Sequence, residues 1–173
     1  MHQQASPQAL ASFWNPRFPG QISDHLVIAE ELTENVIDLE GHDFVVVPLG
    51  HTDTDNTTCL HVPSVGLVVA GDAAYNDVHL YLAESNAHTL SEWIAALDTI
   101  ESLHPRAVIA GHKRPGNDDG PRIIEETRQY IRDFDRLAET TTTARELYDQ
   151  VLSLYPHRVN SSRLWASARA VKG

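Results

Sequence analysis

The sequence predicts an α/β fold: a mixed sheet of about five or six strands with helices covering one face. Over the first half of the chain, short apolar and β-branched runs alternate with turn residues, as is typical of strands joined in hairpins. Two stretches with helical periodicity, 89–103 and 121–137, lie before and after another apolar run. Because a helix connects that run to the strand before it, the two strands are expected to be parallel, with a right-handed crossover.

Two hairpins and one later strand account for the predicted sheet. Residues 34–39 and 44–47 flank the turn Glu40-Gly41-His42-Asp43, in which His42 is expected to be solvated. Residues 57–62 and 67–70 flank a second turn, Pro63-Ser64-Val65-Gly66. Residues 106–110 form the parallel strand. This order brings the ends of the second, fourth and fifth strands to the same edge of the sheet.

Capping residues and prolines set the expected helix limits. Thr89-Leu90-Ser91-Glu92 reads as a capping box, and the helix that it begins ends at His104-Pro105. Pro121 is expected at the first position of the next helix. A second capping box, Thr143 to Glu146, begins a third helix that stops at Pro156, and a short last helix follows Ser161 or Ser162. At the N-terminus a helix over Pro7–Trp14 is expected to be broken by Asn15-Pro16 and Pro19-Gly20.

Composition restricts the class of partner. The net charge of −11 argues against nucleic acid and against anionic membrane surfaces, because both require clustered Lys and Arg. A small-molecule substrate is therefore expected. Cys59, a buried thiol in its strand, is the single cysteine, so an intrachain disulfide is impossible. The chain has neither a run of ~20 apolar residues nor a secretory signal at its start, which predicts a cytoplasmic location.

Three of the predicted strands end in Gly followed directly by a potential metal ligand. These ligands are His51, Asp72 and His112, after Gly50, Gly71 and Gly111. Two imidazoles and a carboxylate presented at one sheet edge form a ligand set that zinc accepts. Each residue also has a structural alternative, such as an exposed His in the Asx-rich turn 52–56, or an Asp in a turn. The same acidic turn could supply a carboxylate that holds the second nitrogen of His51.

The pieces GHT at 50–52, GD at 71–72 and GH at 111–112 resemble the metallo-β-lactamase superfamily, over roughly residues 34–137. The resemblance implies an αββα sandwich, present here only in part, with a C-terminal helical extension. It also implies a zinc-dependent hydrolase acting on a small ester, lactone, amide or thioester. A complete member holds two metal ions, with His51 ligating one, His112 the other, and Asp72 bridging them as the catalytic carboxylate.

One part of the family pattern is absent from the sequence. The His-x-His-x-Asp-His motif, which supplies the other ligands, does not occur, and Asp24-His25 is not assigned as a ligand pair. We therefore expect a single partial domain over residues 1–173, with a core at 34–137 and C-terminal helices at 138–173. The alternative function is a non-catalytic fragment or degenerate member with at most one weakly bound metal. It would act as a homo-oligomer or with a separate N-terminal half.

Several other polar residues have weaker assignments. Lys113 and Asn76 are candidate substrate-binding residues. Lys113 and Arg114 could hold an anionic group of a substrate, or could simply pair with Asp118 and Asp119. His79 is expected near the mouth of the pocket, and neither it nor His61, His88, His104 or His157 is assigned as a ligand. The sequence contains no Ser-His-Asp arrangement, Gly-rich phosphate loop or nucleophile elbow.

Overall fold

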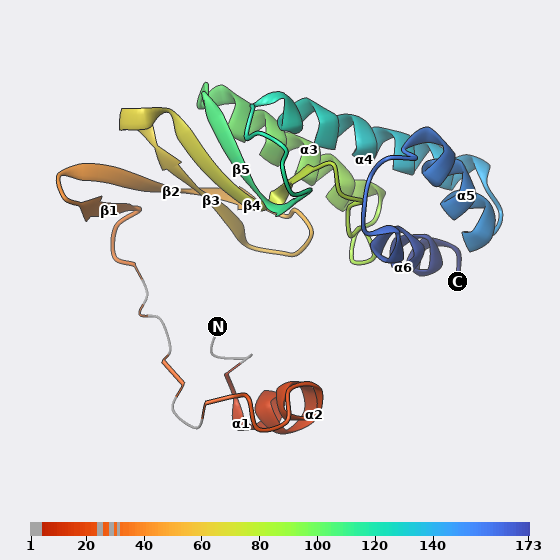
Figure 1. Cartoon of the computed structure of the whole chain (residues 1–173), viewed down its shortest axis with the longest axis horizontal. Coiled ribbons are helices and arrows are strands. Elements are labelled where there is room, and N and C mark those ends of the chain that lie inside the picture. The colour runs from red at the N-terminus through yellow and green to blue at the C-terminus, as the bar shows by residue number, and fades with distance from the viewer. Residues whose placement is uncertain (1–4, 24–25, 28–29, 31) are drawn as a thin grey trace. The chain divides into compact units, whose positions relative to one another are not determined.

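The structure, a computed structural model, describes residues 5–23, 26–27, 30 and 32–173. Residue contacts divide the chain into two compact units, Met1–Glu34 and Asn35–Gly173 (Figure 1). Asp24-His25 lies outside the described residues. None of the described helices is long and apolar enough to cross a bilayer.

The N-terminal unit contains a short helix that is longer than predicted. It consists of α1 (Pro7–Ala9), the π-helical turn η1 (Leu10–Trp14) and α2 (Asn15–Arg17). The prediction that Asn15-Pro16 breaks the helix is wrong. Pro16 lies in the first turn of α2, where a missing N–H is tolerated, and the wider turn of η1 precedes it.

The second unit is built on a five-stranded sheet whose strands lie side by side in chain order. All neighbouring pairs are antiparallel except the last, which is parallel as predicted. The strands are β1 (Val36–Leu39), β2 (His42–Gly50), β3 (Thr57–Val62), β4 (Leu67–Asn76) and β5 (Ala107–Lys113). The α/β class with a mixed sheet is therefore confirmed.

Three strands, β2, β4 and β5, extend beyond their predicted limits, and β5 ends at Lys113, three residues past Ala110. β2 begins at His42, because the first hairpin turns on only two residues, Glu40 and Gly41. Both have positive φ, 55° and 82°, the geometry that matches the twist of paired strands. His42 is therefore an exposed strand residue paired with Leu39 and not a turn residue. β4 continues six residues past Ala70, to Asn76, through irregular pairing with β5.

Four helices complete the second unit. They are α3 (Ala87–Ser102), α4 (Arg122–Thr140), α5 (Ala144–Leu154) and α6 (Ser161–Lys172). α3 begins two residues before Thr89, because Asn86 is its N-cap and accepts hydrogen bonds from the amides of His88 and Thr89. Thr89 completes the capping box in place of Glu92, which corrects the predicted start. The predicted Thr143–Glu146 capping box of α5 is confirmed.

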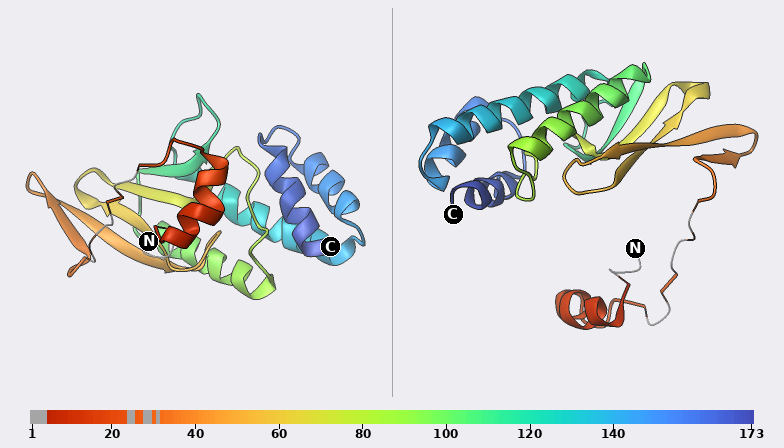
Figure 2. Two further views of the ribbon diagram at one scale, coloured as in Figure 1. Left: turned by 90° about the horizontal axis from the view of Figure 1, so that it is seen from below. Right: turned by 180° about the vertical axis from the view of Figure 1, so that it is seen from behind.

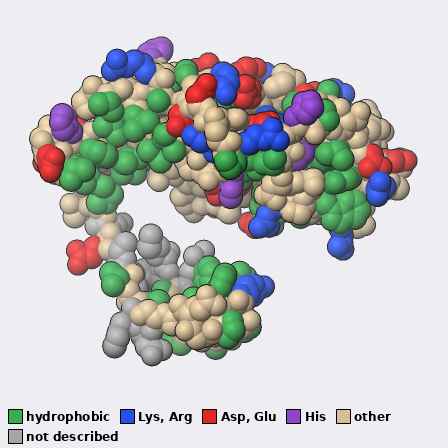
Figure 3. Space-filling view, in the orientation of Figure 1, with side chains coloured by type: hydrophobic (Ala, Val, Ile, Leu, Met, Phe, Trp, Pro, Cys, Tyr) green, Lys and Arg blue, Asp and Glu red, His purple; other side chains and the backbone are tan. Residues whose placement is uncertain are grey.

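The core lies between the sheet and α3 and α4 and continues to α5 and α6, whose Leu147 and Leu164 are completely buried. α3 and α4 pack on the same side of the sheet (Figure 2), where Val68, Ala70 and Val108 are buried with Trp93 and Ile123. Strand side chains that do not face α3 and α4 are more exposed to solvent. Figure 3 shows a group of hydrophobic side chains at the surface of the sheet. The exposed apolar residues of this part of the unit are Val36, Ile37, Leu39, Val65 and Val69.

Candidate active site

The predicted ligands come from strands that end at one edge of the sheet. β2 and β4 both run antiparallel to β3, and β5 runs parallel to β4, so these three strands point the same way. His51 directly follows β2, Asp72 lies in β4 and His112 lies in β5. Strand order therefore brings these three positions to the same edge of the sheet.

Asp72 and His112 meet at this edge. The Oδ1 atom of Asp72 lies 3.5 Å from Nε2 of His112, and the two side chains are 42% and 50% exposed. Gly111 makes room for the carboxylate, because a Cβ atom at this position would lie 2.0 Å from Asp72 Oδ1. Gly71 adopts the left-handed φ of +56° just before Asp72. The two glycines in the GD and GH pieces thus have direct steric roles.

Buried contacts from the helices hold the strand segment after Asp72. The indole Nε1 of Trp93, on α3, donates a hydrogen bond to the carbonyl of Ala73 at 2.8 Å. The amide of Tyr75 donates to the hydroxyl of Thr127, on α4, at 3.1 Å. The ring of Tyr75 in turn lies 5.2 Å from the imidazole of His112, centroid to centroid. Both helices therefore fix the irregular end of β4 against which the Asp–His pair rests.

His51 is held separately by its own loop. Its Nδ1 lies 2.7 Å from Oδ1 of Asp55, so the acidic turn supplies the carboxylate partner that was predicted. Its Nε2 lies 3.5 Å from the hydroxyl of Ser85, and its side chain is only 8% exposed. The pairing of β2 with β3 shifts between Pro48 and Gly50, just before this residue.

Two of the three predicted ligands lie together, and the third does not join them. No group of three His, Cys, Asp or Glu residues in the described part of the chain could hold a metal ion. Asp72 and His112 are in contact, but His51 forms no three-residue group with them among the described residues. A catalytic zinc needs three protein ligands and an open position. The described residues therefore fit one side of a zinc site and do not complete it.

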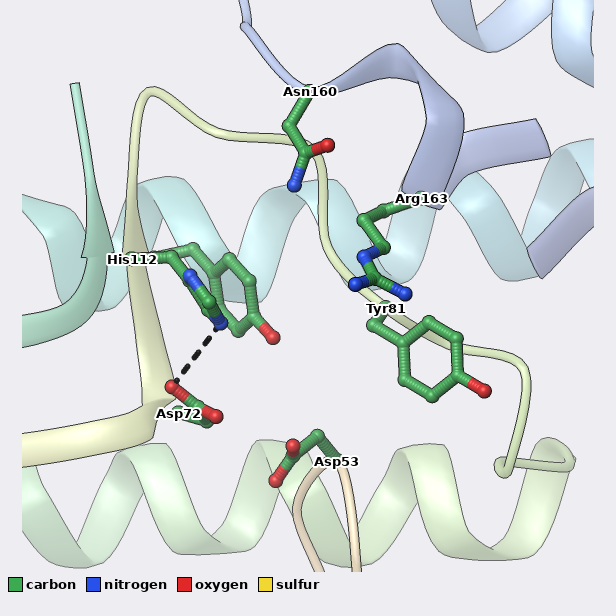
Figure 4. Close-up of a pocket in the computed structure, with 7 residues that line it drawn as sticks. Asp53, Asp72, Tyr81, His112, Asn160 and Arg163 are labelled. Carbon is green, nitrogen blue, oxygen red and sulfur yellow. Dashed lines mark ion pairs between the residues drawn. The ribbon is translucent and has the colours of Figure 1, made fainter. Parts of the chain in front are cut away.

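A cavity of about 210 Å³ opens beside the Asp–His pair (Figure 4). Its lining residues are Asp53, Asp72, Tyr75, Tyr81, His112, Asn160 and Arg163. Burial and the charge of Asp72 raise the pKa of the Asp53 carboxyl. Burial, followed by the charges of Asp72 and Asp53, raises the pKa of the Tyr75 hydroxyl far above its usual range. Tyr75 is therefore a protonated donor at neutral pH.

The sequence did not identify five of these lining residues, Asp53, Tyr75, Tyr81, Asn160 and Arg163. Asp53 follows the predicted ligand His51 in the acidic turn, which is the only sequence signal that could have indicated it. Tyr81 lies in the irregular connection between β4 and α3, while Asn160 and Arg163 lie at the start of α6. None of these three carries a local pattern, because they meet the strand edge only through tertiary packing.

The other predicted residues have structural partners. Asn76 is buried, donates to the carbonyl of Asp118 at 2.7 Å and accepts from the Asn117 side chain, and it does not line the cavity. Lys113 pairs with Asp119 at 2.8 Å, as the alternative to substrate binding predicted. Arg114 pairs with Asp77 instead of Asp118 or Asp119, at 3.1 Å. A substrate role for Asn76 or Lys113 stays a prediction.

His79 is not near the pocket mouth, and this prediction is wrong. Its side chain is completely buried, and Nδ1 lies 3.0 Å from the hydroxyl of Tyr130. Burial, together with the nearby charge of Arg158, lowers its pKa to about 4. The backbone explains why His79 is buried. Its amide donates a hydrogen bond to the carbonyl of Val159, which holds residues 77–79 beside the start of α6.

The mixed sheet, the helices that cover it and the Asp–His pair at its edge define an α/β protein with a metallo-hydrolase-like fold. A model of the metallo-beta-lactamase superfamily matches residues 2–112, and the chain therefore belongs to this superfamily. The match ends at His112, so α4, α5 and α6 lie beyond it.

Solved structures agree on the fold. A metallo-beta-lactamase family protein from Thermus thermophilus is 20% identical, with a TM-score of 0.60 over 98% of this chain and 59% of that one. A beta-lactamase domain protein from Burkholderia ambifaria is 16% identical, with a TM-score of 0.56 over 83% of this chain and 44% of that one. The chain thus spans 59% and 44% of the lengths of these two proteins. No protein with a curated description matches it.

Proposed function

We propose that the chain contributes Asp72, His112 and His51 to the metal site of a zinc-dependent hydrolase. The contact between Asp72 and His112 carries this proposal, because it places a carboxylate and an imidazole together at a solvent-open strand edge. The substrate class is a small ester, lactone, amide or thioester, with Asp72 as the catalytic carboxylate between two metal positions. Bound zinc would supply Lewis acidity and a water of lowered pKa.

The protein contributes position and orientation to this chemistry. Gly111 leaves the space into which the Asp72 carboxylate leans, and Tyr75 supports the imidazole of His112. Asp55 on Nδ1 of His51 is the kind of carboxylate partner that orients a ligating imidazole and raises its basicity.

A second candidate is a non-catalytic role with an incomplete metal site. Two observations favour it: no three-ligand group exists among the described residues, and apolar side chains are exposed on β1 and β4. An exposed edge strand and apolar sheet surface favour association. We propose that a second copy of the chain, or a partner chain that supplies the remaining ligands, covers this surface, and that the isolated chain holds at most one weakly bound zinc.

Metal content distinguishes the two candidates. The purified chain is incubated with zinc, dialysed, and measured by elemental analysis and by sedimentation. We expect less than one zinc per chain, lost further in Asp72→Asn and His112→Ala, whereas His42→Gln serves as a control that removes an exposed imidazole far from the site. Two zinc ions retained per monomer, with turnover of a panel of esters, lactones, amides and thioesters, would establish that the chain alone is an active enzyme.

A further inference from the structure

Arg163 reaches the candidate active site from the C-terminal extension. It lies in the first turn of α6, beyond the part of the chain that the family model matches. Arg163, Tyr81 and Asn160 line the cavity across from Asp72 and His112, and the guanidinium group points into it (Figure 4). Arg163 is the only Lys or Arg among these lining residues.

The guanidinium group is not neutralised by a neighbouring carboxylate. Most other arginines of the second unit form ion pairs, Arg114 with Asp77 and Arg122 with Asp118 and Glu126 for example. No ion pair of the described residues includes Arg163, although Asp53 lines the same cavity. Its contact is with an aromatic face, since the guanidinium carbon lies 5.7 Å from the centroid of the Tyr81 ring.

Backbone and buried side-chain contacts join the segments that carry these residues. Ser167, one turn after Arg163 on α6, is completely buried, and its hydroxyl accepts a hydrogen bond from the amide of Leu82 at 2.8 Å. Val159 next to Asn160 pairs with Val78, and its carbonyl accepts from the amide of His79 at 2.9 Å. These contacts flank Tyr81 on both sides, so Tyr81, Asn160 and Arg163 form one pre-arranged wall of the cavity.

We propose that Arg163, with Tyr81 and Asn160 beside it, binds a carboxylate group of the substrate. The reacting class would then be a small ester, lactone, amide or thioester that also bears a single carboxylate. A guanidinium binds a carboxylate through two parallel hydrogen bonds, and the flat ring of Tyr81 keeps its plane in place. Arg163 offsets the repulsion that Asp53 and Asp72 exert on one carboxylate, and this repulsion increases with each further negative charge on the bound group.

This inference rests on the proposed function for the reaction, but carboxylate binding can be tested without it. The first measurement is butyrate binding to the metal-free chain, followed by NMR chemical shifts. Arg163→Met is expected to weaken binding about tenfold or more, the loss typical of a charge-assisted hydrogen bond. Arg163→Lys, which keeps the charge without the fork, should fall between. Arg169→Met, on the same helix but away from the cavity, is the matched control and should bind as the parent does.

The second measurement compares two esters on the zinc-supplemented chain, 4-acetoxybutyrate and the neutral butyl acetate. Arg163→Met should lower kcat/KM about tenfold or more for the anionic ester and leave the neutral ester unchanged. If neither ester is hydrolysed but butyrate binding depends on Arg163, the proposed function fails and the anion site stands. If both esters are hydrolysed and neither readout depends on Arg163, the anion site is refuted and the proposed function stands.

Discussion

His79 is predicted to make the folded unit lose stability as the pH falls from 7 to 5. The imidazole is completely buried against Tyr130 on α4, and its Nε2 is without a hydrogen-bond partner in the described residues. The guanidinium of Arg158 stacks over the ring of Tyr130, 4.7 Å from its centroid, and its charge opposes protonation of His79. Asp77 favours protonation but has the smallest effect of the three causes.

The magnitude follows from the two protonation equilibria. The pKa of His79 is about 4 in the folded state and 6.5 as its ordinary value, so the unfolded state binds the proton more tightly. Stability is therefore complete above pH 6.5, is lost as the pH falls below it, and stops falling near pH 4. At about 1.4 kcal/mol for each pKa unit, the loss is roughly 2 kcal/mol at pH 5 and about 3 kcal/mol in total.

Urea unfolding at pH 7.5 and pH 5.0, followed by tryptophan fluorescence, measures this loss. Other groups titrate over the same range, so the informative quantity is the difference between the parent chain and His79→Gln, which keeps a neutral hydrogen-bonding group. The difference in the free energy of unfolding between the two proteins should be about 2 kcal/mol smaller at pH 5.0 than at pH 7.5. His42→Gln, at an exposed position on β2, should leave the pH dependence of the parent intact. A difference between parent and His79→Gln that is the same at both pH values would refute the argument.

Two further predictions concern the strands around the site. Trp93→Phe removes the donor to the Ala73 carbonyl, so a buried acceptor loses its partner. The free energy of unfolding, measured by urea titration, should fall by about 1–3 kcal/mol. A change below about 0.5 kcal/mol would contradict the anchoring role of Trp93. Burial raises the pKa of the Cys59 thiol to about 11 and leaves it 2% exposed, so a disulfide reagent at pH 8 should label the unfolded chain but not the folded one. Rapid labelling of the native chain would show that β3 opens readily.

Local patterns in the sequence were sufficient for the sheet and for the positions of the ligands on it. Hairpin turns at Glu40-Gly41 and before Leu67, with the loop over residues 51–56 between them, reverse the chain three times, and one helix returns it in parallel to β5. Strand order alone then puts His51, Asp72 and His112 at one edge. Short-range periodicity and turn chemistry encode these features, which is why they could be read without tertiary contacts.

The sequence determined the fold class and the strand edge at which His51, Asp72 and His112 lie, and it indicated that the acidic turn after His51 could supply a carboxylate partner. Only the tertiary structure showed that His51 contacts Asp55 and Ser85 and does not join Asp72 and His112 in a three-residue group, that His79 is a buried core residue, and that Arg163 lines the cavity. The physical reason is the same in each case. These outcomes depend on which side chains from distant segments meet and on how much water they lose, and neither quantity leaves a period or a spacing in the sequence.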